Sequence, residues 1–160
     1  SDGGYPGISD PGYRLIRTCA KENIPYEVIP GASAVPVALL SSGLPPSSYI
    51  FKGFAPRKPG HRRKFIEEDA ASHHTLVFYE SPFRIGKFLG ELLEVLGDRQ
   101  AAVCLELTKQ FERTLRGRLS ELTARFAENP PKGEAVIVVQ GLTDKNKEEE
   151  DEDDVQDPAH

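Results

Sequence analysis

The chain opens with the dodecapeptide Ser1-Asp-Gly-Gly-Tyr-Pro-Gly-Ile-Ser-Asp-Pro-Gly12, which holds four glycines, two prolines and two aspartates. Glycine permits backbone angles that other residues avoid and proline fixes φ, so this composition is typical of a shaped loop. Asp10 is a suitable N-cap and Pro11 a suitable first helical residue, which predicts a helix over residues 10–23. Such a loop presents free backbone N–H groups of the helix start to a ligand.

The loop does not match the common phosphate-binding motifs. Tyr13 stands where a phosphate loop that begins at Gly7 needs lysine, and no Gly-x-Gly-x-x-Gly fingerprint is present. Two carboxylates beside backbone amides suit a ligand that carries positive charge and hydroxyl groups, and S-adenosylmethionine is one such molecule. An ordinary glycine- and proline-rich loop before a helix explains the same residues.

Charge is unevenly distributed along the 160 residues, whose formal net charge is −5. Nine acidic and two basic residues lie between Asp144 and Asp157, so the rest of the chain is weakly basic. The run of seven carboxylates over 148–154 predicts a disordered acidic tail over 143–160. An intramolecular mimic of nucleic acid, lying on a basic groove, is the alternative.

Several classes of protein are disfavoured. Cys19 and Cys104 are too few and too far apart for a disulfide framework or a zinc site, which favours a cytoplasmic protein. No run of roughly 18 apolar residues predicts a membrane span. His73 and His74 lack a third ligand at a usual spacing, so we expect no metal site. A Gly-x-Ser-x-Gly nucleophile elbow is also absent.

Hydrophobic periodicity predicts alternating strands and helices, hence an α/β fold. Strands are expected over residues 26–29, 49–54, 75–79, 101–107, 114–116 and 135–140. Helices are expected over 10–23, 33–43 with Ser33 as the cap, about 64–71 after a basic loop, 81–97 and 120–127. Pro45-Pro46-Ser47-Ser48 is the expected linker between two domains.

Blocks of sequence in a fixed order resemble the tetrapyrrole methylase superfamily. The dodecapeptide is similar to the family signature Ser-Asp-Ala-Gly-Thr-Pro-Gly-Ile-Ser-Asp-Pro-Gly, with Tyr5 in place of threonine. The matching blocks that follow are Ile29-Pro-Gly-Ala-Ser-Ala34, Ser42-Gly-Leu-Pro45, Phe51-Lys-Gly-Phe-Ala-Pro-Arg-Lys58, Phe78-Tyr-Glu-Ser-Pro82, Glu106-Leu-Thr-Lys109, Leu115-Arg-Gly117 and Gly133-Glu134. Within the superfamily, the resemblance is greatest to the branch that 2′-O-methylates a cytidine of small-subunit ribosomal RNA.

This resemblance implies two α/β domains, the first of them incomplete. Residues 1–47 would form the C-terminal part of a cofactor-binding domain, 48–142 a substrate-side domain and 143–160 the acidic tail. The family's further N-terminal portion does not precede the dodecapeptide, so we expect a fragment of a longer protein. The family also implies S-adenosylmethionine as cofactor, ribosomal RNA or the small ribosomal subunit as partner, and a homodimer.

Cofactor contacts are implied at two strand-to-helix turns besides the opening loop. The turn after residue 29 and the turn after Glu80 both follow strands, where ligands bind in open α/β sheets. From the family pattern, the pocket is lined by Asp2, Gly3, Gly4, Tyr5, Ser9, Asp10, Pro30, Gly31, Ala32, Ser33, Tyr79 and Glu80. A purely structural role remains open for Ser33 as a helix cap, for Tyr79 at a strand end and for Glu80 near a helix N-terminus.

A basic loop over residues 57–64 is the candidate RNA-binding segment. Its cations are Arg57, Lys58, Arg62, Arg63 and Lys64. Such a cluster suits a phosphate backbone, but a solvated basic face or a partner with several carboxylates explains it equally. Phe51, Phe54 and Phe65 flank the loop and either stack on bases or pack in the core.

Glu106 and Lys109 are the candidate catalytic residues. Methylation of a ribose hydroxyl releases a proton, which a general base accepts. Glu106 meets that need, as does Lys109 if burial lowers the pKa of its amine. Alignment of the reactants alone, with these two residues forming a salt bridge, is the alternative.

The predicted function is S-adenosylmethionine-dependent 2′-O-methylation of small-subunit ribosomal RNA. One alternative keeps the enzyme class and changes the substrate to a corrin or porphyrin carbon. A second alternative is a non-catalytic RNA-binding or assembly module on the same scaffold.

Overall fold

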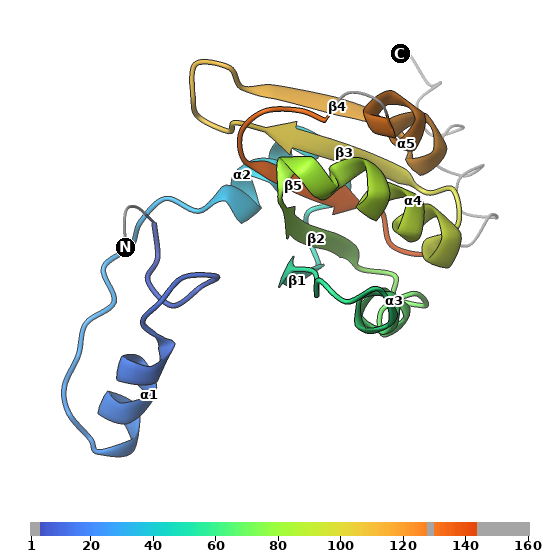
Figure 1. Ribbon diagram of the computed structural model, residues 1–160. Helices are drawn as coiled ribbons and strands as arrows, with labels where there is room; N and C mark the ends of the chain where they lie inside the picture. Colours follow the sequence, from blue (N-terminus) through green and yellow to red (C-terminus); the bar gives the residue numbers. More distant parts are fainter. Residues whose placement is uncertain (1–3, 128–129, 144–160) are drawn as a thin grey trace, which may run out of the picture.

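The computed structural model describes residues 4–127 and 130–143. At its centre lies a five-stranded sheet in the order β1-β2-β5-β3-β4 (Figure 1). The strands are β1 Tyr49–Phe54, β2 Thr75–Glu80, β3 Gln100–Leu105, β4 Arg113–Arg118 and β5 Ala135–Val139. β1 and β2 are parallel, and every other neighbouring pair is antiparallel. The carboxyl ends of β1, β2 and β3 therefore meet the amino ends of β4 and β5 at one edge.

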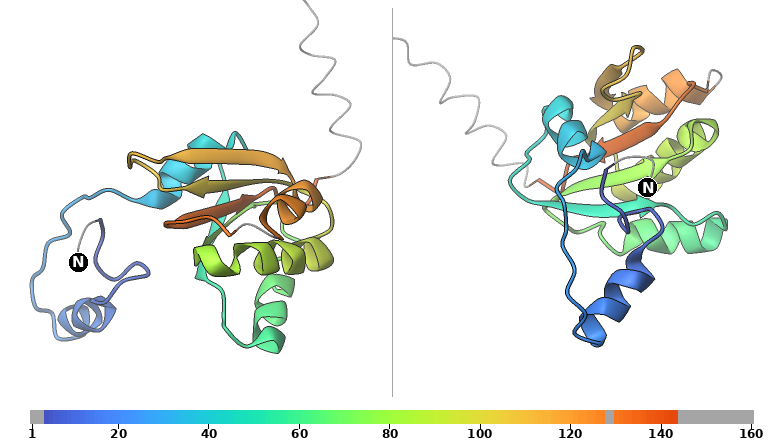
Figure 2. Two further views of the ribbon diagram at one scale, coloured as in Figure 1. Left: turned by 45° about the horizontal axis from the view of Figure 1, so that its top comes forward. Right: turned by 90° about the vertical axis from the view of Figure 1, so that its left-hand side faces the viewer.

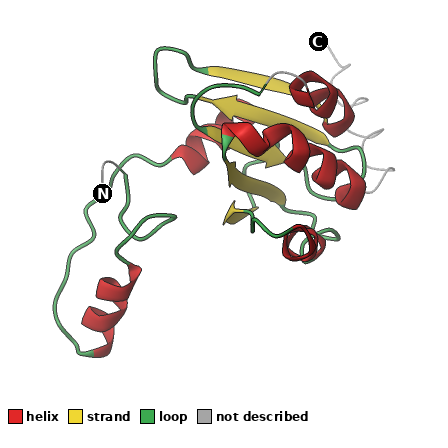
Figure 3. Cartoon of the chain, viewed as in Figure 1, coloured by secondary structure: helices red, strands yellow, loops and turns green. Residues whose placement is uncertain are grey.

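Helices cover both faces of the sheet (Figures 2 and 3). One face packs on α2, Ala34–Ser42, and the other on α4, Ile85–Leu96, and α5, Leu119–Ala127, with α3, Pro59–Glu67, beside α4. Successive strand side chains alternate between these faces. In β2, Val77 packs with the α2 cluster, whereas Leu76 and Phe78 pack with the α4 cluster.

The expected strands over 49–54, 75–79, 101–107, 114–116 and 135–140 are confirmed, with ends shifted by up to two residues. The expected amphipathic helix after Ser81 is also confirmed. It begins with a 3₁₀ turn, η1, Pro82–Arg84, before α4, and its apolar stripe is buried. The predicted α/β fold, with alternating strands and helices, is thus confirmed.

The first helix differs from its prediction. α1 spans Tyr13–Lys21 rather than residues 10–23, and Gly12, not Asp10, occupies the N-cap position with φ 134°. The loop continues to Gly12 because the Gly7 N–H donates to the Pro11 carbonyl at 3.1 Å and closes a tight turn there. α1 stands apart from the sheet (Figure 1). It buries no residue, and its Leu15 is 70% exposed.

The strand expected over residues 26–29 is wrong. This segment is extended but unpaired, because none of the described strands lies beside it to complete a ladder. An extended conformation without inter-strand hydrogen bonds is not a strand.

Two further local predictions need correction. The basic segment 57–64 is not a loop throughout, because α3 already begins at Pro59, a favourable first helical residue. Ser33 occupies the N-cap position of α2 as expected, but its side chain forms no capping hydrogen bond. The expected end of α2 is confirmed, since Gly43 follows it in the left-handed conformation with φ 75°.

Candidate functional site

A cavity of about 660 Å³ opens at the sheet edge where β1, β2 and β3 end. The cavity is formed by six segments: the opening loop, the start of α2, the end of β1, the end of β2, the loop after β3 and the start of β5. Its lining residues are Gly4, Tyr5, Ile8, Ser9, Asp10, Ala32, Ser33, Ala34, Val37, Phe54, Tyr79, Glu80, Ser81, Pro82, Leu107, Thr108, Lys109, Gly133, Glu134, Ala135 and Val136.

Close backbone contacts place the opening loop against the rest of the site. Gly4 has φ 72°, and a Cβ atom there would meet the Ala32 carbonyl oxygen at 2.5 Å. Ser9 lies on the bulge of β1: a Cβ atom at Gly53, whose φ is 67°, would lie 3.2 Å from the Ser9 hydroxyl oxygen. Glycine at both positions therefore permits the loop to approach α2 and β1.

Two of the residues that line this cavity, Asp10 and Glu80, each have a buried carboxylate oxygen without a partner. Glu80 is buried, and its Oε1 accepts the Ser81 N–H at 2.6 Å and pairs with Arg84 at 2.5 Å. Its Oε2 has no partner, and neither does Oδ2 of Asp10. These are the two buried side-chain polar atoms without a partner in residues 4–127 and 130–143. Because an unpaired buried oxygen is costly, both indicate a ligand that donates hydrogen bonds or carries positive charge.

An aromatic cluster forms the wall beside Glu80. The Tyr79 ring lies edge-on to Phe51 and Phe54, with ring centroids 4.9 and 5.5 Å apart. Burial, together with the negative charge of Glu134, raises the pKa of the Tyr79 hydroxyl. Tyr79 therefore keeps its proton at neutral pH and offers the cavity an apolar ring with one hydrogen-bond donor.

Glu106, Lys109 and Glu134 form a connected ionic network at the edge of the cavity. The Lys109 amine lies 2.9 Å from Glu134 Oε2 and 3.3 Å from Glu106 Oε1, and these bonds raise its pKa. The condition under which Lys109 was predicted to act as a base, a pKa lowered by burial, is not met. A hydrogen bond from the Glu134 N–H, at 2.7 Å, lowers the pKa of Glu106. Glu106 therefore carries a weakly basic carboxylate that already holds the turn before β5.

Arg62 was predicted to bind RNA, but it is buried and therefore not part of an exposed basic surface. Arg62 is 5% exposed, and its guanidinium binds Glu91 and the carbonyl oxygens of Pro56 and Arg57. Those bonds fix α3 against α4 and leave no donor face for a phosphate. Its predicted companions Arg57, Lys58, Arg63 and Lys64 are exposed, and Arg63 pairs with Glu67 at 2.8 Å.

Most of the predicted cofactor residues come together here. Gly4, Tyr5, Ser9, Asp10, Ala32, Ser33, Tyr79 and Glu80 all line the cavity. Pro30 and Gly31 do not line it, although Gly31 packs against Gly4. Asp2, Gly3 and the acidic tail lie outside the described residues. Whether this set binds a cofactor remains a prediction.

Sequence reasoning missed several lining residues, above all Leu107, Thr108 and Glu134. Glu106 and Thr108 have positive φ values of 49° and 63°, which turns this loop back over the sheet edge. Glu134 precedes an antiparallel strand inserted between β2 and β3. The block Gly133-Glu134 after two prolines was the available signal, because it marks a turn immediately before a strand.

Two classes of feature are missing from the described part of the chain. It has no group of three or more His, Cys, Asp or Glu side chains suited to hold a metal ion. Within the same residues, no helix is both long and apolar enough to cross a membrane.

Comparison with known proteins identifies the family. The model of the tetrapyrrole (corrin/porphyrin) methylases matches residues 1–123, more than half of the chain. The chain belongs to this family. Similarity to individual proteins extends further along the chain. The chain is 45% identical over 150 residues to a ribosomal RNA small subunit methyltransferase I of Halalkalibacterium halodurans, covering 94% of this chain and 52% of that protein.

Other relatives agree. A ribosomal RNA small subunit methyltransferase I of Mycobacterium bovis is 47% identical over 142 residues, covering 88% of this chain and 50% of that protein. The chain thus spans about half the length of the curated relatives it matches. Among solved structures, the methyltransferase CobJ has a TM-score of 0.65 at 18% identity, covering 87% of this chain and 62% of that one. Uroporphyrin-III C-methyltransferase of Thermus thermophilus, complexed with S-adenosyl homocysteine, has a TM-score of 0.54 at 23% identity, covering 86% of this chain and 62% of that one. These likenesses establish the tetrapyrrole methylase fold.

Proposed function

We propose that the chain forms part of an S-adenosylmethionine-dependent methyltransferase that methylates a ribose 2′-hydroxyl of small-subunit ribosomal RNA. The observation that carries this proposal is the pair of unpartnered carboxylate oxygens, Asp10 Oδ2 and Glu80 Oε2, in residues that line one cavity. Names of relatives at 42–47% identity support ribosomal RNA as the substrate.

The residues present fit S-adenosylmethionine. Its ammonium and ribose hydroxyls are the donors that two unsatisfied carboxylates require. The apolar wall formed by Tyr79 and Phe54 suits the flat adenine ring. Asp10, Glu80 and Tyr79 would hold the cofactor, together with the backbone around Gly4 and Ala32. When bound, S-adenosylmethionine supplies a methyl group activated by a neighbouring sulfonium.

Catalysis then rests on orientation and on charge. Asp10, Glu80 and Tyr79 would hold the methyl donor beside the ribose of the RNA, and the proton of the ribose hydroxyl would pass to solvent. Alignment of the two reactants supplies most of the acceleration. Lys109 is the one cation among the described residues that line the cavity, and its protonated amine would stabilise negative charge on the ribose oxygen as the proton leaves. Glu106 and Glu134 position that amine.

A methyl-transfer assay tests this function. Purified protein is incubated with S-adenosylmethionine that carries a labelled methyl group and with small ribosomal subunits from cells that lack the enzyme. Label on a ribose, located by mass spectrometry of nuclease fragments, supports the proposal. Label on an added uroporphyrin and not on RNA supports the tetrapyrrole alternative. RNA binding without transfer, by protein that binds the cofactor, supports the non-catalytic module.

Assembly and location are parts of the same proposal. Apolar side chains of α1 and of the extended segment after it are exposed, among them Tyr13, Leu15, Val28 and Ile29. Such a surface favours burial against more polypeptide, as a homodimer would provide. We place the protein in the cytoplasm with the ribosome. Sedimentation equilibrium distinguishes a dimer from a monomer.

A further inference from the structure

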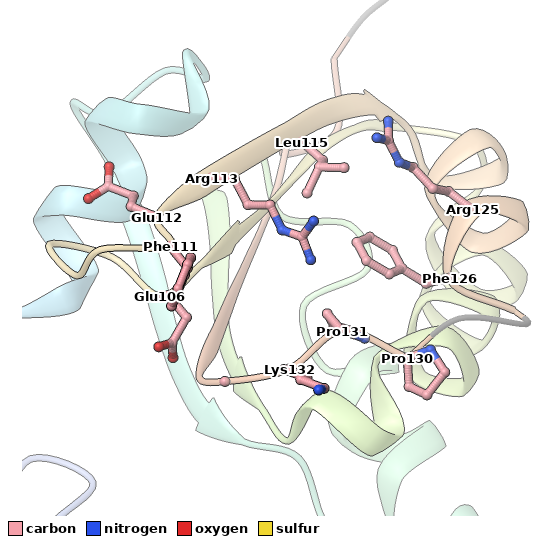
Figure 4. A pocket seen from close by; sticks show the side chains of 11 residues that line it. Glu106, Phe111, Glu112, Arg113, Leu115, Arg125, Phe126, Pro130, Pro131 and Lys132 are labelled. Atoms are coloured by element: carbon pink, nitrogen blue, oxygen red, sulfur yellow. The ribbon is translucent and has the colours of Figure 1, made fainter.

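A second hollow, of about 860 Å³, lies on the opposite side of the turn before β5 (Figure 4). It is enclosed by the loop between β3 and β4, the start of β4, the end of α5 and the segment 130–133. Its lining residues are Glu106, Phe111, Glu112, Arg113, Leu115, Arg125, Phe126, Pro130, Pro131, Lys132 and Gly133. None of these residues belongs to the basic segment 57–64, so the hollow is a separate feature.

In this hollow the negatively charged side chains have partners, whereas three of the positively charged ones have none among the described residues. Both carboxylates have partners: Glu106 bonds to Lys109 and to the Glu134 N–H, and Glu112 accepts the Thr108 N–H at 2.5 Å. Arg113, Arg125 and Lys132 are exposed, and these three have no ion pair or side-chain hydrogen bond with any described residue. Three free cations beside two occupied carboxylates favour an anionic ligand.

Apolar surface fills the space between those cations. Phe111, just before β4, is 73% exposed, whereas Phe126 is 6% exposed and forms the inner wall. In Figure 4 the Arg113 guanidinium and the Phe126 ring reach into the hollow from opposite sides. A ligand that matches both features combines a flat ring with a phosphate, as a nucleotide does. Exposed aromatic rings beside arginines are the usual means of holding unpaired bases.

The hollow adjoins the first cavity directly. Gly133 lines both, so a single turn of backbone separates them. Glu106, in the wall of the hollow, bonds to Lys109, in the wall of the first cavity, at 3.3 Å. A chain of nucleotides that places one ribose beside Lys109 therefore has its neighbour within reach of the hollow.

From these observations we infer that the hollow binds a single-stranded RNA nucleotide next to the one that is methylated. Its base packs against Phe111 and its phosphate contacts Arg113 and Lys132. This inference rests on the proposed function, since it names a substrate subsite for the same reaction.

Fluorescence anisotropy with a labelled single-stranded RNA oligonucleotide tests the subsite. In the purified protein, Phe111→Ala is expected to weaken RNA affinity about 5- to 150-fold, the effect of one lost stacking contact. The double variant Arg113→Gln/Lys132→Gln is expected to reduce the slope of log affinity against log salt by about 1.4, because each single-strand phosphate contact contributes about 0.7. Tyr49→Ala, at the far end of β1, and Arg17→Gln, on α1, are the matched controls and are expected to change neither quantity.

The outcomes separate this inference from the proposed function. Unchanged RNA affinity and salt slope in the hollow variants, with RNA still methylated by the unaltered protein, overturn the subsite and leave the function intact. Absence of methylation by unaltered protein that binds S-adenosylmethionine overturns the function instead. Loss of uroporphyrin binding in these variants, with RNA affinity unchanged, also overturns the subsite. Titration with S-adenosylmethionine is expected to give the same affinity in every variant, which shows that each is folded.

Discussion

The Lys109 amine lies 2.9 Å from Oε2 of Glu134, which ties the loop after β3 to the residue before β5. Glu106 completes the network on the other side of the same amine at 3.3 Å. This arrangement keeps a positive charge at the edge of the cavity and also closes the turn that separates the two hollows. In the proposed function, catalysis and local stability therefore depend on the same three side chains.

Replacement of the lysine tests its role in the reaction. Lys109→Met is expected to lower the kcat of methyl transfer about tenfold or more, because the partly exposed ammonium no longer stabilises the attacking oxygen. Lys109→Arg, which keeps the charge, is expected to retain most activity. Steady-state kinetics on small ribosomal subunits measures both effects. Equal kcat values for Lys109→Met, Lys109→Arg and the unaltered protein would contradict a role of the lysine charge in the reaction.

The pH profile gives an independent check on the same residue. Hydrogen bonds to Glu134 and Glu106 raise the pKa of Lys109, so its protonated form persists above the usual lysine value. We expect no fall in kcat from lysine deprotonation between about pH 7 and 9, in contrast with a lysine that acts as a neutral base. An increase in kcat with pH that disappears in Lys109→Arg would show the opposite role.

Gly133 is expected to tolerate no side chain. Its φ is 88°, and a Cβ atom would overlap the Glu106 carboxylate that closes the turn. Gly133→Ala should lower the free energy of unfolding by about 1 to 3 kcal/mol, through backbone strain and the displaced carboxylate. Urea denaturation measures the loss. Gly60→Ala is the matched control, because nothing lies within 4 Å of its added Cβ, and it should be neutral or slightly stabilising.

Arg62 is expected to act in stability and not in RNA binding. Arg62→Met leaves Glu91 without its buried partner and should lower the free energy of unfolding by about 2 to 3 kcal/mol. Arg63→Met, one residue along, removes only two surface pairs, with Glu67 and Glu94, each worth at most about 0.5 kcal/mol. Equal losses in urea denaturation would contradict this assignment. So would a reduced salt slope for RNA binding by folded Arg62→Met protein.

The same ion pair, between Arg62 and Glu91, predicts that the stability of the folded protein decreases at acidic pH. The hydrogen bond from Arg62 lowers the pKa of Glu91 in the folded protein. Its stabilising contribution is therefore present above the usual glutamate pKa of about 4.3 and is lost as pH falls through the lower folded value. Urea midpoints measured between about pH 7 and 3 should fall more steeply for the unaltered protein than for Arg62→Met. Parallel curves for the two proteins would contradict this prediction.

Much of the sheet could be predicted because its strands and α4 carry their own patterns. The run Ala135–Val139 is apolar throughout and lies buried on both faces, and Phe88, Leu89 and Leu92 recur at helical spacing. The segment 26–29 carries a similar apolar pattern, but pairing decides strand formation and none of the described strands lies beside it. Leu15 of α1 is exposed for the same reason, because an apolar side chain of a helix is buried only where another element covers it.

The site was harder to predict than the fold. Asp10 and Glu80 lie in motifs with a recognisable loop-to-helix form, and the structure places both at one cavity. Glu134 joins them only because β5 runs antiparallel between β2 and β3, an insertion that local sequence does not encode. Arg62 was misassigned because nothing in a dense run of cations marks the position that is buried and binds Glu91 of α4.

Calorimetric titration with S-adenosylmethionine tests the central claim most directly. The account predicts saturable binding that Asp10→Asn and Glu80→Gln each weaken about 10- to 100-fold, the effect of one lost hydrogen bond to a charged group. Glu94→Gln, an exposed carboxylate on α4, should bind like the unaltered protein. Thermal melts establish that all three variants are folded. Absence of binding by the folded protein, or equal affinity in all variants, would contradict the assignment of this cavity to the cofactor.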